Sequence, residues 1–160
     1  MSVILTSSDD KSFTVDLRVV KHSGTILGLL ENVDAESLSE HPIPLMNVTG
    51  EILEKIIEWL AHHQNDVVVE RDEWRKKVSG TIPQWDRDFM EQFDNDGLFH
   101  MLMGANYLDI RNLLDICTEL ISVQLKGKNT EQLRAHFGII NDFTPEEEAE
   151  MKKENNWNEI

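Results

Sequence analysis

Cysteine and histidine are the residue types in this chain that could supply nucleophilic or metal-binding chemistry. Cys117 is the single cysteine, and its place on an apolar stripe at helical spacing favours an inert core thiol over a nucleophile. The histidines are His22, His41, His62, His63, His100 and His136. Only His62 and His63 are adjacent, and neighbours on a helix point in different directions, so they make a poor metal pair. A position at the end of a helix favours such histidines for dipole and capping reasons instead.

Phosphate-binding and acid–base chemistry find no better support. The segment Lys126-Gly127-Lys128 is typical of the end of a helix and does not match a phosphate-binding glycine loop. The acidic run from Glu146 to Glu148 is typical of a solvated helix start. The sequence therefore predicts a protein that is not an enzyme, with no catalytic, cofactor-binding or metal-binding residues.

Charge and composition point to protein partners. The 160 residues hold 30 acidic and 15 basic side chains, for a formal net charge of −15. Contact with phosphates needs clustered lysine and arginine, so this balance argues against nucleic acid and anionic membranes as partners. A single cysteine excludes an intrachain disulfide. The first residues do not match a signal peptide, and no apolar run approaches the ~20 residues that span a bilayer. We expect a soluble, intracellular protein.

The first third of the chain predicts a mixed α/β domain. Residues 3–5 and 13–15 are rich in β-forming residues around a Ser-Ser-Asp-Asp cluster, which predicts a hairpin. Residues 43–45 can form a short strand, and Pro44 confines that strand to the edge or end of a sheet. Residues 34–41 are predicted to be a loop. Helices are predicted through Val19 and Lys21, at 25–31 and at 47–63, the last with Thr49 as N-cap.

Beyond an exposed connection at 67–81, the chain is predicted to be helical. The predicted helices lie at 83–93, 98–108 and 110–126, followed by one that ends at Phe137 and one that starts at Thr144, with a break at 94–97. Gly127 suits a left-handed cap, Asn129 can cap the helix that follows it, and Gly138 closes that helix. Thr144 and Glu147 form a capping-box pattern around Pro145.

The helix at 110–126 has more apolar surface than an ordinary surface helix. At about 100° per residue, its apolar residues form two adjoining stripes that together cover roughly 200°, about twice the usual ~100°. The first stripe is Leu113, Leu114, Cys117, Ile121 and Leu125, and the second is Ile116, Leu120 and Val123. Burial on two sides within its own domain would explain this arc. Alternatively, one stripe packs inward and the other meets the terminal helices or a bound protein.

The terminal helix favours that second explanation. It offers only Ala149 and Met151 as apolar residues, with Phe143 before it and Trp157 after it. A helix this short is marginal by itself in water, so it must dock or fray. We therefore expect the last ~35 residues to form a docking extension that is mobile in the free protein and ordered in a complex.

Many short segments, in order, resemble the Skp1 family of ubiquitin-ligase adaptors across nearly the whole chain. They are Ser7-Ser8-Asp9, Pro42-Ile43-Pro44-Leu45, Asn47-Val48, Trp59-Leu60-Ala61-His62-His63, Ile82-Pro83-Gln84-Trp85-Asp86, Ala105-Asn106-Tyr107-Leu108-Asp109-Ile110, Leu113-Leu114-Asp115, Lys126-Gly127-Lys128, Asn141-Asp142-Phe143-Thr144, Glu146-Glu147-Glu148 and Glu154-Asn155 to Trp157. Each segment is weak evidence alone, but this many in order are specific.

The resemblance implies a BTB/POZ-type α/β domain over residues 1–125, with a variable exposed loop at 67–81, and a helical F-box-binding extension over 126–160. It implies an adaptor that bridges a cullin scaffold to F-box substrate receptors for ubiquitin-dependent degradation, in the cytoplasm and nucleus. A weak homodimer is also expected. The cullin-binding positions implied are Asn106 and Tyr107. The F-box-binding positions implied are Leu114, Thr118, Ile121, Leu125, Phe137, Ile139 and Trp157.

The chain departs from the family pattern at three places. Its loop at 67–81 is valine-rich and basic and contains Trp74, where the family often has an acidic, proline-containing loop. Thr130 stands where proline is usual, which implies the loss of a helix start and of any proline modification. Gly104 replaces a common alanine, at a cost to the helix of about 1 kcal/mol. A divergent paralogue with a narrowed partner set is expected.

Two other readings remain open from the sequence. An elongin C type of BTB adaptor lacks the terminal segments quoted above. A self-associating BTB/POZ scaffold without a role in a ligase belongs to a different functional class, and the loss of cullin binding on substitution of Asn106 and Tyr107 would distinguish the adaptor from it.

Overall fold

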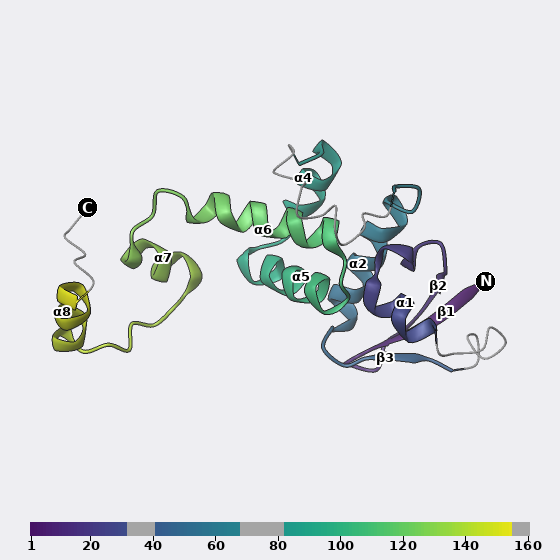
Figure 1. Cartoon of the computed structure of the whole chain (residues 1–160), viewed down its shortest axis with the longest axis horizontal. Helices are drawn as coiled ribbons and strands as arrows, with labels where there is room; N and C mark the ends of the chain where they lie inside the picture. Colours follow the sequence, from purple (N-terminus) through teal and green to yellow (C-terminus); the bar gives the residue numbers. More distant parts are fainter. Residues whose placement is uncertain (32–40, 68–81, 155–160) are drawn as a thin grey trace. The chain divides into compact units, whose positions relative to one another are not determined.

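The computed structural model describes residues 1–31, 41–67 and 82–154 (Figure 1). The chain divides into two compact units, Met1–Gln124 and Leu125–Ile160. The predicted loop at 34–41 lies outside the described residues except for His41, and the predicted connection at 67–81 lies outside them except for Val67. Trp157 also lies outside them. Within the described residues, no helix is long and apolar enough to cross a membrane.

The first unit begins with a small three-stranded sheet in the order β2-β1-β3. Strands β1 (Ser2–Ser7) and β2 (Ser12–Asp16) form the predicted hairpin, with Val3 opposite Val15. Strand β3 (Ile43–Leu45) runs parallel to β1 at the edge of the sheet. The edge position was predicted from Pro44, because proline has no backbone N–H to donate to a second neighbouring strand. The mixed α/β class predicted from the sequence is confirmed.

The hairpin turn provides the cap of helix α2 (Gly50–His62). Thr49 occupies the N-cap position but makes no side-chain capping bond, so that part of the prediction is wrong. The Asp9 carboxylate accepts from the Gly50 N–H at 2.6 Å and from the Ser7 hydroxyl at 2.7 Å. These bonds, chiefly the one from Ser7, lower the pKa of Asp9 to about 2. Asp9, 41 positions earlier in the chain, thus caps the start of α2. The helix begins at Gly50, three residues later than predicted.

Because the folded-state pKa of Asp9 is depressed, its stabilising effect is present above its ordinary pKa near 3.9 and is lost as the pH falls through about 2. Asp9→Asn should therefore be less stable than the wild type at pH 7, and the difference should shrink between pH 4 and pH 2. Urea unfolding at several pH values measures this. Asp10→Asn removes the same charge from the same turn without touching Gly50 and is the matched control. A difference for Asp9→Asn that stays constant with pH would contradict the assignment.

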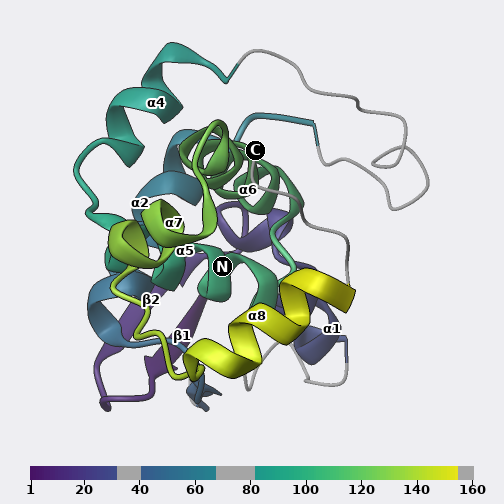
Figure 2. The same cartoon turned by 90° about the vertical axis from the view of Figure 1, so that its left-hand side faces the viewer.

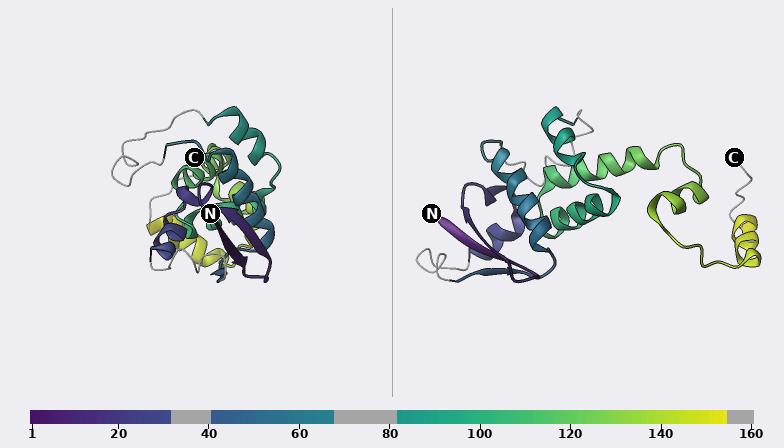
Figure 3. Two further views of the ribbon diagram at one scale, coloured as in Figure 1. Left: turned by 90° about the vertical axis from the view of Figure 1, so that its right-hand side faces the viewer. Right: turned by 180° about the vertical axis from the view of Figure 1, so that it is seen from behind.

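Helices complete the first unit around one continuous apolar core. They are η1 (Val20–His22), α1 (Gly24–Leu30), α2, α4 (Gln84–Met90), α5 (Asn95–Tyr107) and α6 (Arg111–Leu125), whose last residue begins the second unit. Helices α2 and α5 pack against each other (Figure 3). The buried side chains come from the sheet and from every one of α1, α2, α4, α5 and α6, with Trp59 among the largest.

The break between α4 and α5 lies at residues 91–94, three residues earlier than the predicted 94–97. Asp94 is the N-cap of α5, and its side chain accepts from the Gly97 N–H at 2.8 Å. Residues 95–97 are consequently the first turn of α5, because a capping aspartate satisfies the amides that would otherwise be exposed. Helix α4 is correspondingly shorter than the predicted 83–93.

The second unit holds α7 (Thr130–Phe137) and α8 (Pro145–Glu154), labelled in Figure 2. Asn129 and Gln132 form a capping box at α7, so this helix starts at Thr130 without a proline, and the start implied to be lost is present. Thr144 and Glu147 form the predicted box at α8. Gly127 adopts the predicted left-handed conformation at φ 75°, and Gly138, predicted to close α7, is left-handed as well at φ 65°.

Candidate protein-binding sites

Cys117, His62 and His63, which could have supplied chemistry, have structural roles in the fold. Cys117 is buried in α6, and burial raises the pKa of its thiol to about 12, so the thiol stays protonated and unreactive at neutral pH. The prediction of a core thiol is confirmed. Among the described residues, no group of three or more histidine, cysteine, aspartate or glutamate side chains could hold a metal ion.

His63 serves a buried polar network beyond the predicted dipole and capping roles. Its Nε2 lies 3.0 Å from Asp86 Oδ1 and its Nδ1 lies 2.7 Å from Asp66 Oδ2, a contact that lowers the pKa of Asp66. The Trp59 indole N–H donates to the same Asp86 oxygen at 2.7 Å. Asp86 is buried, and α4 is thereby bound to the end of α2. Neither local pattern nor spacing in the sequence indicates this network, because its members are 23 and 27 residues apart.

His62 points elsewhere and stacks on Trp85, with ring centroids 3.6 Å apart and planes 2° apart. Trp85 stacks in turn on Phe89. His63 meets the edge of the same Trp85 ring and stacks on Trp59. The two adjacent histidines therefore contact Trp85 from different directions, as the divergence of neighbouring positions on a helix predicts.

The first candidate binding site lies at the carboxyl end of α5. Asn106 is exposed, and Tyr107 is half-buried and packs against the core. Leu108 and Ile110, which follow them in the chain, are fully buried and hold this end of the helix in place. The structure thus brings together the two residues implied for cullin binding, on one accessible helix end.

Two further residues, which no motif in the sequence indicated, extend this surface. Phe99 and Met103 are 36% and 61% exposed on α5. Their spacing places them on one helical face with Asn106 and Tyr107. A helical wheel of residues 95–107 could have found this face, because Leu98, Met101 and Ala105 form the buried one. We call Phe99, Met103, Asn106 and Tyr107 the α5 surface.

Gly104, on the buried side of the same helix, has a packing reason that the sequence did not reveal. A Cβ at this position would lie 2.7 Å from Ile56 Cδ1 and 3.3 Å from Ile52 Cγ2 of α2. The glycine therefore permits the close approach of α5 and α2, which offsets the loss of helix propensity inferred from the sequence.

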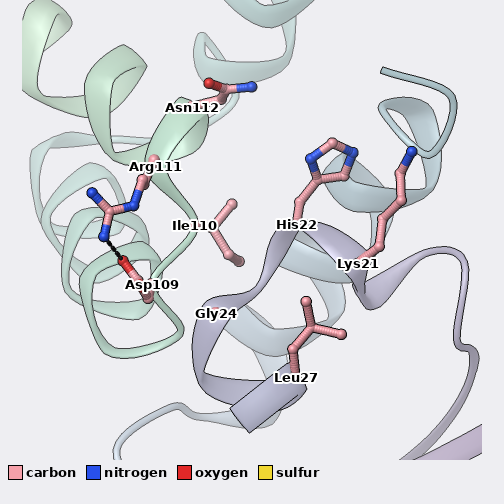
Figure 4. Close-up of a pocket in the computed structure, with 8 residues that line it drawn as sticks. All are labelled: Lys21, His22, Gly24, Leu27, Asp109, Ile110, Arg111 and Asn112. Atoms are coloured by element: carbon pink, nitrogen blue, oxygen red, sulfur yellow. Dashed lines mark hydrogen bonds and ion pairs between the residues drawn. The ribbon is translucent and has the colours of Figure 1, made fainter. Parts of the chain in front are cut away.

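A pocket lies beside the α5 surface, between the α5–α6 junction and the start of α1 (Figure 4). Asp109 and Arg111 stand on one side of it, joined by a hydrogen bond of 2.9 Å, and Lys21 and His22 stand on the other. The Lys21 ammonium donates to the Asp66 carbonyl at 2.8 Å, and His22 Nε2 lies 2.9 Å from the His63 carbonyl oxygen. These four side chains are thus engaged within the first unit.

The second candidate site follows α6. Leu114, Thr118, Ile121 and Leu125 recur at helical spacing along it, as the implied F-box-binding set requires. Leu114 and Ile121 are half-buried against the core, whereas Thr118 is exposed and donates its hydroxyl proton to the Leu114 carbonyl at 2.6 Å. Leu125 is 41% exposed.

Helix α6 does not bury one stripe and expose the other. Leu113 and Cys117 of the first stripe are buried, but Leu125 of the same stripe is exposed. In the second stripe, Leu120 is half-buried and Val123 is 60% exposed. Burial therefore decreases along the helix axis, because the core ends before the helix does, and the expected division between two faces is wrong.

The second unit carries the rest of the implied F-box set. Phe137 is half-buried at the end of α7, and Ile139 is exposed in the connection to α8. Ile140, which no motif in the sequence indicated, is 85% exposed beside it. Glu148 of α8 accepts from Arg134 Nη1 of α7 at 3.0 Å, which joins the two helices, and from Asn141 Nδ2 of the connection at 2.8 Å.

Two family models match the chain. One is described as the tetramerisation domain of the Skp1 family and matches residues 1–65; the other is described as its dimerisation domain and matches residues 111–158. The first covers the sheet, α1 and α2, which form a BTB/POZ-type fold and confirm the predicted architecture.

Named relatives resemble the chain over nearly its full length. "E3 ubiquitin ligase complex SCF subunit sconC" of Talaromyces stipitatus is 43% identical over 98% of this chain and 96% of its own. "Skp1-related protein" of Caenorhabditis elegans is 42% identical over 96% of this chain and 89% of its own. "Suppressor of kinetochore protein 1" of Schizosaccharomyces pombe is 42% identical, over 97% and 96% respectively. With two family models and relatives of this identity covering almost every residue, the chain belongs to the Skp1 family.

Proposed function

We propose that this chain is the adaptor subunit of an SCF-type ubiquitin ligase. In this role it joins a cullin scaffold to F-box substrate receptors and catalyses no step itself. The observation that carries the proposal is the 43% identity, over 98% of the chain, to a protein named as an SCF subunit. The buried, protonated Cys117 thiol agrees with a role in binding and not in ubiquitin transfer.

The cullin contact is proposed at the α5 surface. Exposed apolar residues beside polar ones are typical of a protein interface, and Phe99 and Met103 extend the area around Asn106 and Tyr107. Tyrosine is also among the residues enriched at binding hot spots.

The F-box contact is proposed at the carboxyl-terminal half of α6 and at residues 126–160. Val123 and Leu125 leave apolar surface exposed at the end of α6, and Ile139 and Ile140 do so between α7 and α8. Burial of such exposed apolar side chains by a partner is favourable. We propose the cytoplasm and the nucleus as the compartments in which the complex works.

Reconstitution from purified components tests the proposal. The chain is mixed with a cullin and an F-box protein, separately and together, and the products are separated by size exclusion. The expected result is two binary complexes and one ternary complex in which the cullin and the F-box protein co-elute only when the chain is present. Failure to form either binary complex would refute the adaptor role.

Amide hydrogen exchange tests the docking extension. In the free chain, amides of α7 and α8 should exchange faster than those of α2 and α5, because α7 and α8 hold no fully buried residue. Addition of the F-box protein should slow exchange in α7 and α8 by at least about tenfold, with the amides of α2 as the internal reference. Protection in the free chain equal to that of α2 would contradict the expectation.

Self-association is the second candidate function. It is favoured by the descriptions of the two matched family models, which name dimerisation and tetramerisation. Light scattering across a concentration series would detect a weak homodimer. An oligomer that persists while neither a cullin nor an F-box protein binds would favour a BTB/POZ scaffold over the adaptor.

A further inference from the structure

The last carbonyl groups of α5 are satisfied by another helix. A helix leaves its final four carbonyls without intrahelical partners. Here the Thr25 hydroxyl donates to the Tyr107 carbonyl at 2.7 Å, and the Ser23 hydroxyl donates to the Leu108 carbonyl at 2.6 Å. The Thr25 N–H also donates to Leu108 at 3.3 Å.

Backbone N–H groups at the start of α1 therefore donate to carbonyl groups at and just after the end of α5, so that each helix end satisfies the other. The Gly24 N–H donates to the Asp109 carbonyl at 3.2 Å, so three consecutive residues of one segment contact three consecutive carbonyls of the other. Ser23 is fully buried, and its hydroxyl oxygen also accepts from the Ile26 N–H at 3.2 Å as the N-cap of α1. These residues are separated from α5 by more than 80 positions in the chain.

The backbone just after this contact has little freedom. Asp109 adopts a left-handed conformation at φ 51°, which is uncommon for a residue with a side chain. A Cβ on Gly24 would collide with the Asp109 carboxylate, and Figure 4 shows how Gly24 lies beside Asp109 at the pocket. The side chain of Asp109 is held in turn by Arg111.

We propose that Ser23 and Thr25 are positioning residues for the α5 surface. By binding the carbonyls of Tyr107 and Leu108, they set the direction in which the last turn of α5 presents Asn106 and Tyr107. This inference rests on the proposed cullin contact at that surface. Neither residue needs to touch the cullin, because both act through the backbone of α5.

Thr25→Val is the sharper test, because valine keeps the branched shape and removes only the hydroxyl. The affinity for a purified cullin should fall about fivefold, as expected for the loss of one hydrogen bond, while the affinity for an F-box protein stays unchanged. Thr25→Ser is the matched control. It keeps the hydroxyl, and its affinity for the cullin should stay within about twofold of the wild type. Both affinities are measured by calorimetry, and urea unfolding of each variant reports stability.

Three results would contradict the positioning role of Ser23 and Thr25. Wild-type cullin affinity in Thr25→Val, beside loss of binding in Asn106→Lys/Tyr107→Lys, would overturn the positioning role and leave the adaptor function standing. Equal weakening of cullin and F-box binding would show a merely structural role and overturn it too. If Asn106→Lys/Tyr107→Lys keeps full cullin affinity, the proposed contact is wrong, and the positioning role falls with it.

Discussion

Replacing Asn106 and Tyr107 together by lysine should abolish cullin binding, with a loss of affinity of about 100-fold or more, and should leave F-box binding within about twofold of the wild type. Two ammonium groups would then stand on the α5 surface beside Phe99 and Met103. A partner that covers apolar side chains would have to desolvate both charges, which costs more than an interface of this kind gains. The proposed F-box contact is on α6 and residues 126–160, away from both substitutions in the chain, so F-box binding should be retained.

Folding should survive this double substitution. Asn106 is exposed, and the long stem of a lysine at position 107 can follow the half-buried path of the tyrosine ring while its ammonium reaches solvent. Calorimetric titration with a cullin and with an F-box protein measures both affinities. Glu91→Lys is the matched control, because it raises the net charge by the same two units at an exposed position at the end of α4. Retained cullin affinity in the double variant would place the scaffold contact elsewhere.

The largest effect on stability is expected from Asp86→Ala, at about 3 kcal/mol. Asp86 Oδ1 is the acceptor for the Trp59 N–H and the contact of His63 Nε2, and both partners lie inside or at the edge of the core. Removal of the carboxylate leaves two polar nitrogens without it and opens space beside Trp59. Because the network joins α2 to α4, the loss should be felt as a lower free energy of unfolding of the first unit.

Asp88→Ala is the control for this variant. Asp88 lies on the same helix, is exposed, and accepts a hydrogen bond from Gln84 at the surface. We expect its loss to change the free energy of unfolding by less than about 0.5 kcal/mol. Urea unfolding followed by tryptophan fluorescence measures both. A similar, small change in the two variants would show that the buried network contributes little to stability.

Local chemistry explains which elements could be predicted. The cap at Asn129, the capping box at Thr144, the left-handed Gly127 and the helix end at Gly138 were predicted correctly, since each depends on residues within four positions of one another. The hairpin and the edge position of Pro44 follow from equally local rules. Where a cap comes from a distant residue, as at Gly50, the local rule named Thr49 and was wrong.

The binding residues were predicted by a different route. Asn106, Tyr107 and the F-box set came from the resemblance to a family and not from spacing or composition, and their binding roles stay predictions. Helical spacing did predict exposed apolar surface on α6, but it assigned this surface to one face along the helix. In the structure the exposed apolar residues lie at the carboxyl-terminal end of the helix. A wheel describes angles around an axis and contains no information about where the core stops along it.

The sequence by itself determined the α/β class, the hairpin, the capped starts of α7 and α8, the acidic charge and the family, because these depend on neighbouring residues or on the order of short motifs. Only the tertiary structure decided that Asp9 caps α2 and that His63 and Trp59 contact Asp86. It also decided that Gly104 lets α5 approach Ile56 closely, and that Ser23 and Thr25 bind the last carbonyl groups of α5. Each of these contacts joins segments far apart in the chain. Such a contact depends on how the whole core packs, and no local pattern contains that information.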